Sequence, residues 1–145
     1  MKVHYADHYS AATDAVASPE RWARAMFGDV PSAGEVLIWR GFLGLRLSRG
    51  RSPATVAGWW IGDRGDEWIR LEAESWFLAA NMVVRAGDGQ VSLDTFVHYK
   101  RRIAYAVWPP LSAVHRFLAP RVVRDTAAKM ATAAAAETRT RRVYP

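Results

Sequence analysis

The chain of 145 residues contains no cysteine. Disulfides, a thiol nucleophile and cysteine-ligated metals are therefore excluded, and the composition fits a reducing compartment. No window approaches the ~18 apolar residues that a membrane span requires, and the start, Met1-Lys2-Val3-His4, has no signal-like apolar run. We expect a cytoplasmic protein without a membrane span.

Several catalytic motifs are missing as well. There is no Gly-rich phosphate loop, and no serine has His and Asp partners at a recognised spacing. His4 and His8 share a face of a strand but have no third metal ligand in view. Asp63, Asp66 and Glu67 cluster as solvated turn residues do. We expect no metal and no cofactor.

Basic residues give a net charge of +6, but they are mostly arginines scattered along the chain. No helix carries a basic stripe, and phosphate binding needs clustered charge, so we expect no nucleic-acid partner. Arg139, Arg141 and Arg142 lie in a segment, residues 138–145, that we expect to be a disordered basic tail. Half of the residues are hydrophobic, which predicts one globular domain over residues 1–137.

The first third of the chain predicts one strand and two short helices. Residues 3–13 form a strand candidate rich in Tyr and His. Ser18-Pro19-Glu20 is a strong helix start, and this helix should end near Phe27, before Gly28. A second helix is predicted from Val30-Pro31-Ser32 to about Gly44, followed by a basic loop.

From residue 56 the hydrophobic period changes to two, which is typical of a β-meander. Arg64-Gly65, Ser75-Trp76, Asp88-Gly89 and Arg101-Arg102 can each form a tight hairpin, and Asp88-Gly89 is the strongest signal. With two-residue turns, one face of the sheet is free of charge. That face collects Val56, Gly58, Trp60, Ile69, Leu71, Ala73, Leu78, Ala80, Met82, Val84, Val91, Leu93, Thr95, Val97 and Tyr99.

After the last turn we expect a short strand that ends at Pro109-Pro110. Ala104, Ala106 and Trp108 point inward in this register and Tyr105 outward, whereas a longer turn reverses them. A long helix should follow from about Leu111 to Ala136. One stripe of this helix carries Leu111, Val114, His115, Leu118 and Val122.

This order of elements resembles the helix-grip fold of the START and birch-pollen-allergen superfamily. The segment from Val91-Ser92-Leu93-Asp94-Thr95-Phe96-Val97 through Tyr105 to Pro110 and His115-Arg116 is similar to a family of small uncharacterised bacterial proteins in it. The chain departs from that family at Arg102-Ile103-Ala104-Tyr105, where a Gly-Arg is usual. The resemblance implies an α+β fold, with a curved antiparallel sheet and a long C-terminal helix enclosing a hydrophobic cavity. Superfamily members include carriers and cyclases, so fold alone does not choose a function.

Small inward residues such as Ala80 leave space that larger side chains would fill in a solid core, which favours a cavity. His115 is the best candidate for chemistry, as an acid/base or as a group that orients a ligand; its alternative is a structural role at the helix entry. The residues expected to contact a ligand are Trp60, Leu71, Ala80, Met82, Leu93, Thr95, Val97, Tyr99, Tyr105, Trp108, His115 and Leu118.

The leading hypothesis is a binding module for a hydrophobic or aromatic small molecule, lipid- or polyketide-like. The alternative is a cyclase/aromatase-type or lyase-isomerase enzyme, with His115 as acid/base and Tyr99 or Tyr105 orienting a carbonyl. That alternative requires His115 and one of these tyrosines in a common cavity. A third hypothesis is an assembly protein, because an apolar outer patch predicts a homodimer. The patch comprises Trp59, Ile61, Trp68, Val83 and Phe96.

Overall fold

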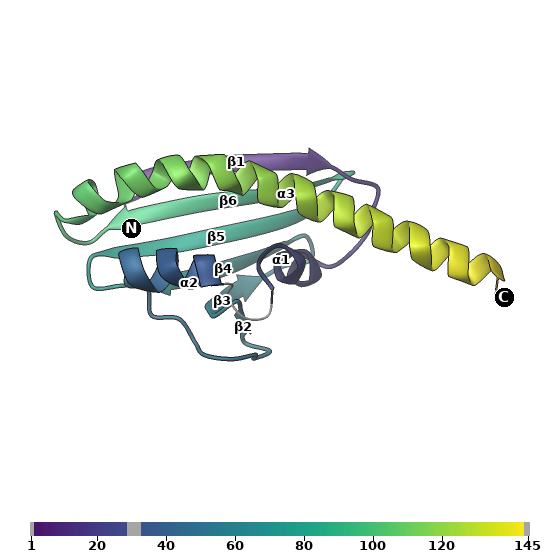
Figure 1. Cartoon of the computed structure of the whole chain (residues 1–145), viewed down its shortest axis with the longest axis horizontal. Helices are drawn as coiled ribbons and strands as arrows, with labels where there is room; N and C mark the ends of the chain where they lie inside the picture. The colour runs from purple at the N-terminus through teal and green to yellow at the C-terminus, as the bar shows by residue number, and fades with distance from the viewer. Residues whose placement is uncertain (1, 29–32, 144–145) are drawn as a thin grey trace.

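A computed structural model describes residues 2–28 and 33–143 and contains a six-stranded antiparallel sheet of order β1-β6-β5-β4-β3-β2. All three helical segments cover one face of this sheet, with α3 lying along β1 and β6 (Figure 1). The chain therefore adopts the helix-grip fold that the sequence predicts. The strands are β1 (Tyr5–Ala12), β2 (Thr55–Val56), β3 (Trp59–Arg64), β4 (Trp68–Glu74), β5 (Leu78–Gly87) and β6 (Gln90–Tyr99).

The first helix, α1 (Pro19–Phe27), has the predicted boundaries. The Ser18 hydroxyl accepts a hydrogen bond from the backbone N–H of Arg21 at 3.2 Å, which satisfies one of the free donors of the first turn. Gly28, with φ of 81°, ends the helix by donating its N–H to the carbonyl of Arg24. The helix buries Trp22 and Ala23 against the sheet.

The second helical segment is α2 (Ala33–Val36), which continues into a π-helical turn, η1 (Leu37–Phe42). The predicted helix start at residues 30–32 lies outside the described residues. Leu43 and Leu45 follow the turn and are buried in the core, while Ile38 and Trp39 pack against it. Together with α1, this segment lies over the strands that α3 leaves uncovered (Figure 1).

The turns of the meander decide which side chains face the helices. Asp88 and Gly89 have φ of 54° and 75°, as the predicted type I′ hairpin requires. The β4–β5 turn lies at Trp76-Phe77 because the Ser75 N–H donates to the Leu78 carbonyl. This shifts the predicted β4–β5 register by two residues, which leaves every side chain on its predicted face.

The predicted orientation of Trp60 and Trp59 is wrong. The turn after β3 lies at Asp66-Glu67, and a β-bulge at Gly62 adds one residue between the pairs Ile61–Leu71 and Asp63–Arg70. One extra residue exchanges the two faces of a strand. Trp59 therefore faces the core with 3% of its surface exposed, whereas Trp60 is 48% exposed on the outer face.

The predicted strand at residues 103–108 is also wrong. The backbone N–H groups of Ala104 and Tyr105 donate to the carbonyls of Arg101 and Arg102, so a turn leads directly into α3 (Ala104–Val143). Pro109 and Pro110 thus lie inside the helix. They leave the carbonyls four residues earlier, on Tyr105 and Ala106, without helical donors, and both of those residues are exposed.

The far end of α3 extends beyond the body of the molecule (Figure 1). Residues 131–140 are all exposed, and the helix continues to Val143. The Ala-rich run has strong helix propensity, which accounts for a helix that continues here without core contacts. The division into a domain of residues 1–137 and a separate tail stays a prediction. Among the described residues, no helix is long and apolar enough to cross a membrane.

Candidate functional site

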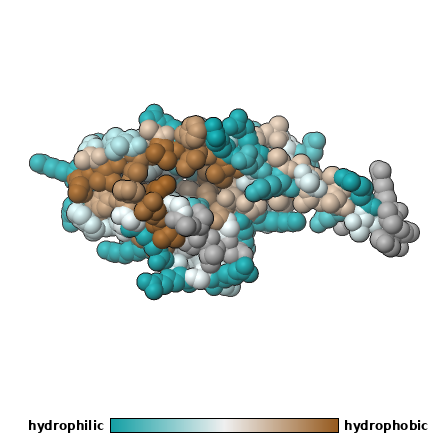
Figure 2. Space-filling model, in the orientation of Figure 1, coloured by the Kyte–Doolittle hydropathy of each residue, from teal (hydrophilic) through white to brown (hydrophobic). Residues whose placement is uncertain are grey.

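An apolar pocket of about 290 Å³ lies between the sheet, η1 and α3. Figure 2 shows apolar surface gathered over the first half of α3 and over the α2 region on this side of the molecule. Among the described residues, Glu35 and His115 are the only charged or titratable side chains in the lining of the pocket. The lining is formed by Phe27, Gly34, Glu35, Ile38, Trp39, Leu43, Trp59, Ala80, Met82, Leu93, Thr95, Val97, Trp108, Leu111, Val114, His115, Leu118, Ala119 and Val122.

Most of the residues that the sequence singles out as ligand contacts lie around this pocket. They are Ala80, Met82, Leu93, Thr95, Val97, Trp108, His115 and Leu118. Leu71 is fully buried in the core and outside the lining, and Trp60 lies on the outer face. Trp59 takes the place predicted for Trp60 because of the bulge at Gly62.

Tyr99 and Tyr105 do not share the pocket with His115. Tyr99 stacks on His4 at 4.7 Å between ring centroids and makes an edge contact with Tyr105 at 4.6 Å. Burial and the neighbouring Tyr105 raise the pKa of the Tyr99 hydroxyl. The geometric condition for an enzyme that uses Tyr99 or Tyr105 together with His115 is therefore not met.

The most informative side chain near the pocket is Asp7, which sequence reasoning did not select. Its Oδ2 atom lies 3.0 Å from His115 Nε2, an ion-pair distance, although the two atoms are outside hydrogen-bond geometry. The Tyr5 hydroxyl donates to the same Oδ2 at 2.6 Å. Asp7 pairs across the strands with Thr95, so β1 and β6 bring this carboxylate to the pocket wall behind His115. The alternation of residues along β1 places Tyr5, Asp7 and Tyr9 on one face, and this pattern is the sequence feature that could have identified Asp7.

The environment of Asp7 favours the charged carboxylate. Burial acts to raise the pKa of Asp7, but the opposing effects of His115, Tyr5 and Thr95 together hold that pKa below its usual value. Burial and the hydrogen bond to Asp7 raise the pKa of Tyr5 far above its ordinary value. At neutral pH, Asp7 is therefore ionised, and the Tyr5 hydroxyl remains a hydrogen-bond donor.

Several buried polar atoms around the pocket have no hydrogen-bond partner among the described residues. The indole Nε1 atoms of Trp59 and Trp108 belong to this group, and so does Thr95 Oγ1. Buried polar groups are normally paired, and an unpaired one costs about 1–3 kcal/mol. Unpartnered donors in the wall of a pocket are groups that a ligand oxygen or a water molecule could satisfy.

No protein-family profile and no curated protein sequence matches this chain. Among solved structures, the crystal structure of ginseng major latex-like protein 151 from Panax ginseng resembles it with a TM-score of 0.49 and 10% sequence identity. The similarity covers 89% of this chain and 99% of the ginseng chain.

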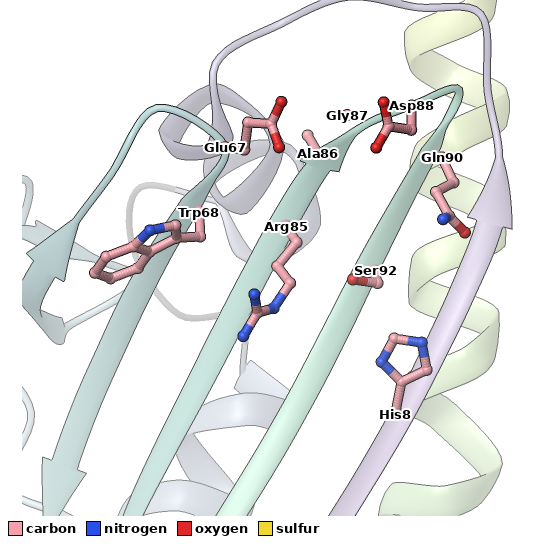
Figure 3. Close-up of a pocket in the computed structure, with 9 residues that line it drawn as sticks. All are labelled: His8, Glu67, Trp68, Arg85, Ala86, Gly87, Asp88, Gln90 and Ser92. Carbon is pink, nitrogen blue, oxygen red and sulfur yellow. The ribbon is translucent and has the colours of Figure 1, made fainter.

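A second, polar cleft lies on the other face of the sheet, at the end that carries the β3–β4 and β5–β6 turns (Figure 3). Asp94 forms an ion pair with His8 there and a second one with Arg85, whose Nε lies 3.3 Å from Asp94 Oδ2. The same carboxylate thus contacts both side chains. No group of three His, Asp or Glu residues able to hold a metal occurs in the described part of the chain.

Proposed function

We propose that the pocket binds a hydrophobic or aromatic small molecule, lipid- or polyketide-like, and that the chain belongs to the START and birch-pollen-allergen superfamily. The observation that carries the first proposal is an open space walled almost entirely by apolar side chains beneath α3. A volume of about 290 Å³ is at the lower end for small-molecule sites. It suits a ligand of one to three rings or a single medium-length chain.

The binding proposal can be tested with the neutral fluorescent probe N-phenyl-1-naphthylamine. Ala80 lines the pocket, so Ala80→Leu should fill part of it and weaken probe binding about tenfold, the size of a ~1.4 kcal/mol loss of contact. The control is Ala79→Leu, because Ala79 precedes it on the same strand and points to the opposite face. Absence of probe uptake by the wild type, or equal affinities for the two variants, would refute binding in this pocket.

An enzyme acting on such a ligand is the second candidate, and the contact between Asp7 and His115 favours it. A carboxylate that holds an imidazole in place is a common arrangement for general acid/base catalysis. The enzyme hypothesis from the sequence assigns a carbonyl-orienting role to Tyr99 or Tyr105. With both tyrosines outside the pocket, another donor must take that role.

Other predictions about partners and location remain proposals. Because of the bulge at Gly62, Trp59 and Ile61 face inward and Trp60 faces outward. The outer apolar patch therefore comprises Trp60, Trp68 and Phe96, with Val83 largely covered. We propose that this patch mediates a homodimer. A cytoplasmic location and the lack of a nucleic-acid partner are proposed on the grounds of composition.

A further inference from the structure

We infer that the pocket transfers a proton at the carbon next to a ketone, with Trp108 and Thr95 binding the carbonyl oxygen and His115 accepting the proton. This inference rests on the proposed ligand-binding pocket and deepens it by naming a substrate class, neutral ketones, and a reaction. It follows from three observations on the described residues: an indole donor without a partner, an imidazole next to a carboxylate, and a lining without Lys or Arg.

The carbonyl-binding donor is Trp108. Its side chain is 5% exposed, it lines the pocket, and its Nε1 has no partner among the described residues. An indole N–H can only donate, so the group that satisfies it must be an acceptor such as a carbonyl oxygen. The Thr95 hydroxyl is 4% exposed, lies in the same wall across the strands from Asp7, and has no hydrogen bond of good geometry among the described residues. Donors fixed in a water-poor site stabilise negative charge that develops on such an oxygen.

The proton acceptor is His115. Its ring centroid lies 5.7 Å from that of Trp108, so base and donor flank the same part of the pocket. The carboxylate of Asp7 lies 3.0 Å from Nε2, and its negative charge favours the tautomer with the proton on Nε2, which leaves Nδ1 for the substrate. Tyr5, bonded to Asp7 at 2.6 Å, holds that carboxylate in place. Asp7 is thus a positioning residue.

The charges of the lining select a neutral substrate. Among the described residues, the lining contains no Lys or Arg, and its one imidazole, His115, already has the carboxylate of Asp7 beside it. The other charged lining residue, Glu35, is an acid. A buried carboxylate or phosphate would have no counter-ion here, and an isolated buried charge is strongly unfavourable. A protonated amine could not accept the N–H of Trp108.

The reaction is balanced without a cofactor. The bond between the α-carbon and its hydrogen breaks, and the proton passes to Nδ1 of His115. The electron pair forms the carbon–carbon double bond of an enolate, whose oxygen takes the negative charge and accepts hydrogen bonds from Trp108 and Thr95. The imidazolium then returns the proton to the same carbon, or to a conjugated carbon in an isomerisation.

The test is hydrogen–deuterium exchange of 2-tetralone in D₂O, followed by proton NMR, with binding measured by displacement of N-phenyl-1-naphthylamine. We expect the wild type to accelerate loss of the α-proton signals. His115→Gln should slow the exchange about 100-fold. The matched control is His8→Gln, because His8 also pairs with an aspartate but lies on the opposite face and should exchange as the wild type does.

Two further variants separate chemistry from folding. Trp108→Phe should slow exchange about 100-fold, the usual effect of removing one oxyanion donor, whereas Trp60→Phe on the outer face should have no effect. Asp7→Asn should lower the exchange rate while tetralone affinity stays within about twofold, a split that general unfolding would not produce. Tetralone that binds without exchange above the buffer rate, or exchange that persists in His115→Gln, would overturn the inference and leave the binding pocket intact. Failure of both probe and tetralone to bind would instead overturn the pocket itself.

Discussion

Replacement of the two adjacent tryptophans of β3 by alanine should have very different effects on stability. Trp59 is 3% exposed and contacts Trp39 at 5.4 Å between ring centroids, whereas Trp60 is 48% exposed on the other face. Truncation of a buried Trp costs about 3–5 kcal/mol. For Trp60→Ala we expect less than about 1 kcal/mol, because half of the side chain is already in water.

The difference is large enough for a thermal melt. At roughly 3 °C per kcal/mol for a domain of this size, Trp59→Ala should lower Tm by about 10 °C and Trp60→Ala by about 3 °C or less. Circular dichroism of the ligand-free proteins measures both, and urea denaturation gives the free energies independently. The two variants have the same amino-acid composition, so the difference between their Tm values reports only the different surroundings of the two tryptophans. A larger loss for Trp60→Ala would mean that the bulge at Gly62 is absent and that the two faces are reversed.

Three further predictions concern charge, backbone and assembly. Asp7 should contribute stability that is fully present above its unfolded pKa of 3.8 and is lost as the pH falls through its lower folded pKa. Asp7→Asn should therefore reduce the fall of Tm at acidic pH. An unchanged fall of Tm in this variant would contradict the role of the contacts of Asp7. Gly89→Ala should lower the free energy of unfolding by about 1 kcal/mol in urea denaturation, because φ is 75° there. The control Gly34→Ala, with open space around its Cβ position, should be neutral or stabilising. Equal losses of stability in the two variants would argue against the type I′ turn. In light scattering at micromolar concentration we expect a dimer that Trp60→Lys converts to a monomer, and a monomeric wild type would end the dimer proposal.

The parts of the fold that the sequence predicts correctly are those with local chemical signals. Ser18 and Pro19 define the start of α1 because a capping hydroxyl and a fixed φ act within one turn. Asp88 and Gly89 define the β5–β6 hairpin because both positions need positive φ. From this turn the alternation along β6 gives the inward positions of Leu93, Thr95 and Val97 directly.

Two errors arose where such signals are absent or ambiguous. A bulge at Gly62 has no signature beyond a glycine inside a strand, yet it exchanges the faces of all residues before it in β3. At Pro109-Pro110, the sequence is compatible with the end of a strand, but the fixed φ of proline also fits a helix. A helix tolerates them here because the carbonyls of Tyr105 and Ala106, which lose their donors, are on exposed residues.

The omission of Asp7 has a different physical origin. Its position at the pocket depends on the pairing of β1 with β6, strands that more than 75 residues separate in the chain. A charged residue on an otherwise apolar face looks unfavourable until its partners are known, and those partners, His115 and Tyr5, come from α3 and from the same strand. The alternation along β1 could have placed Asp7 on the inner face. Only the packing of α3 across β1 shows that this charge is matched, and that match turns an isolated histidine in an apolar pocket into a candidate base.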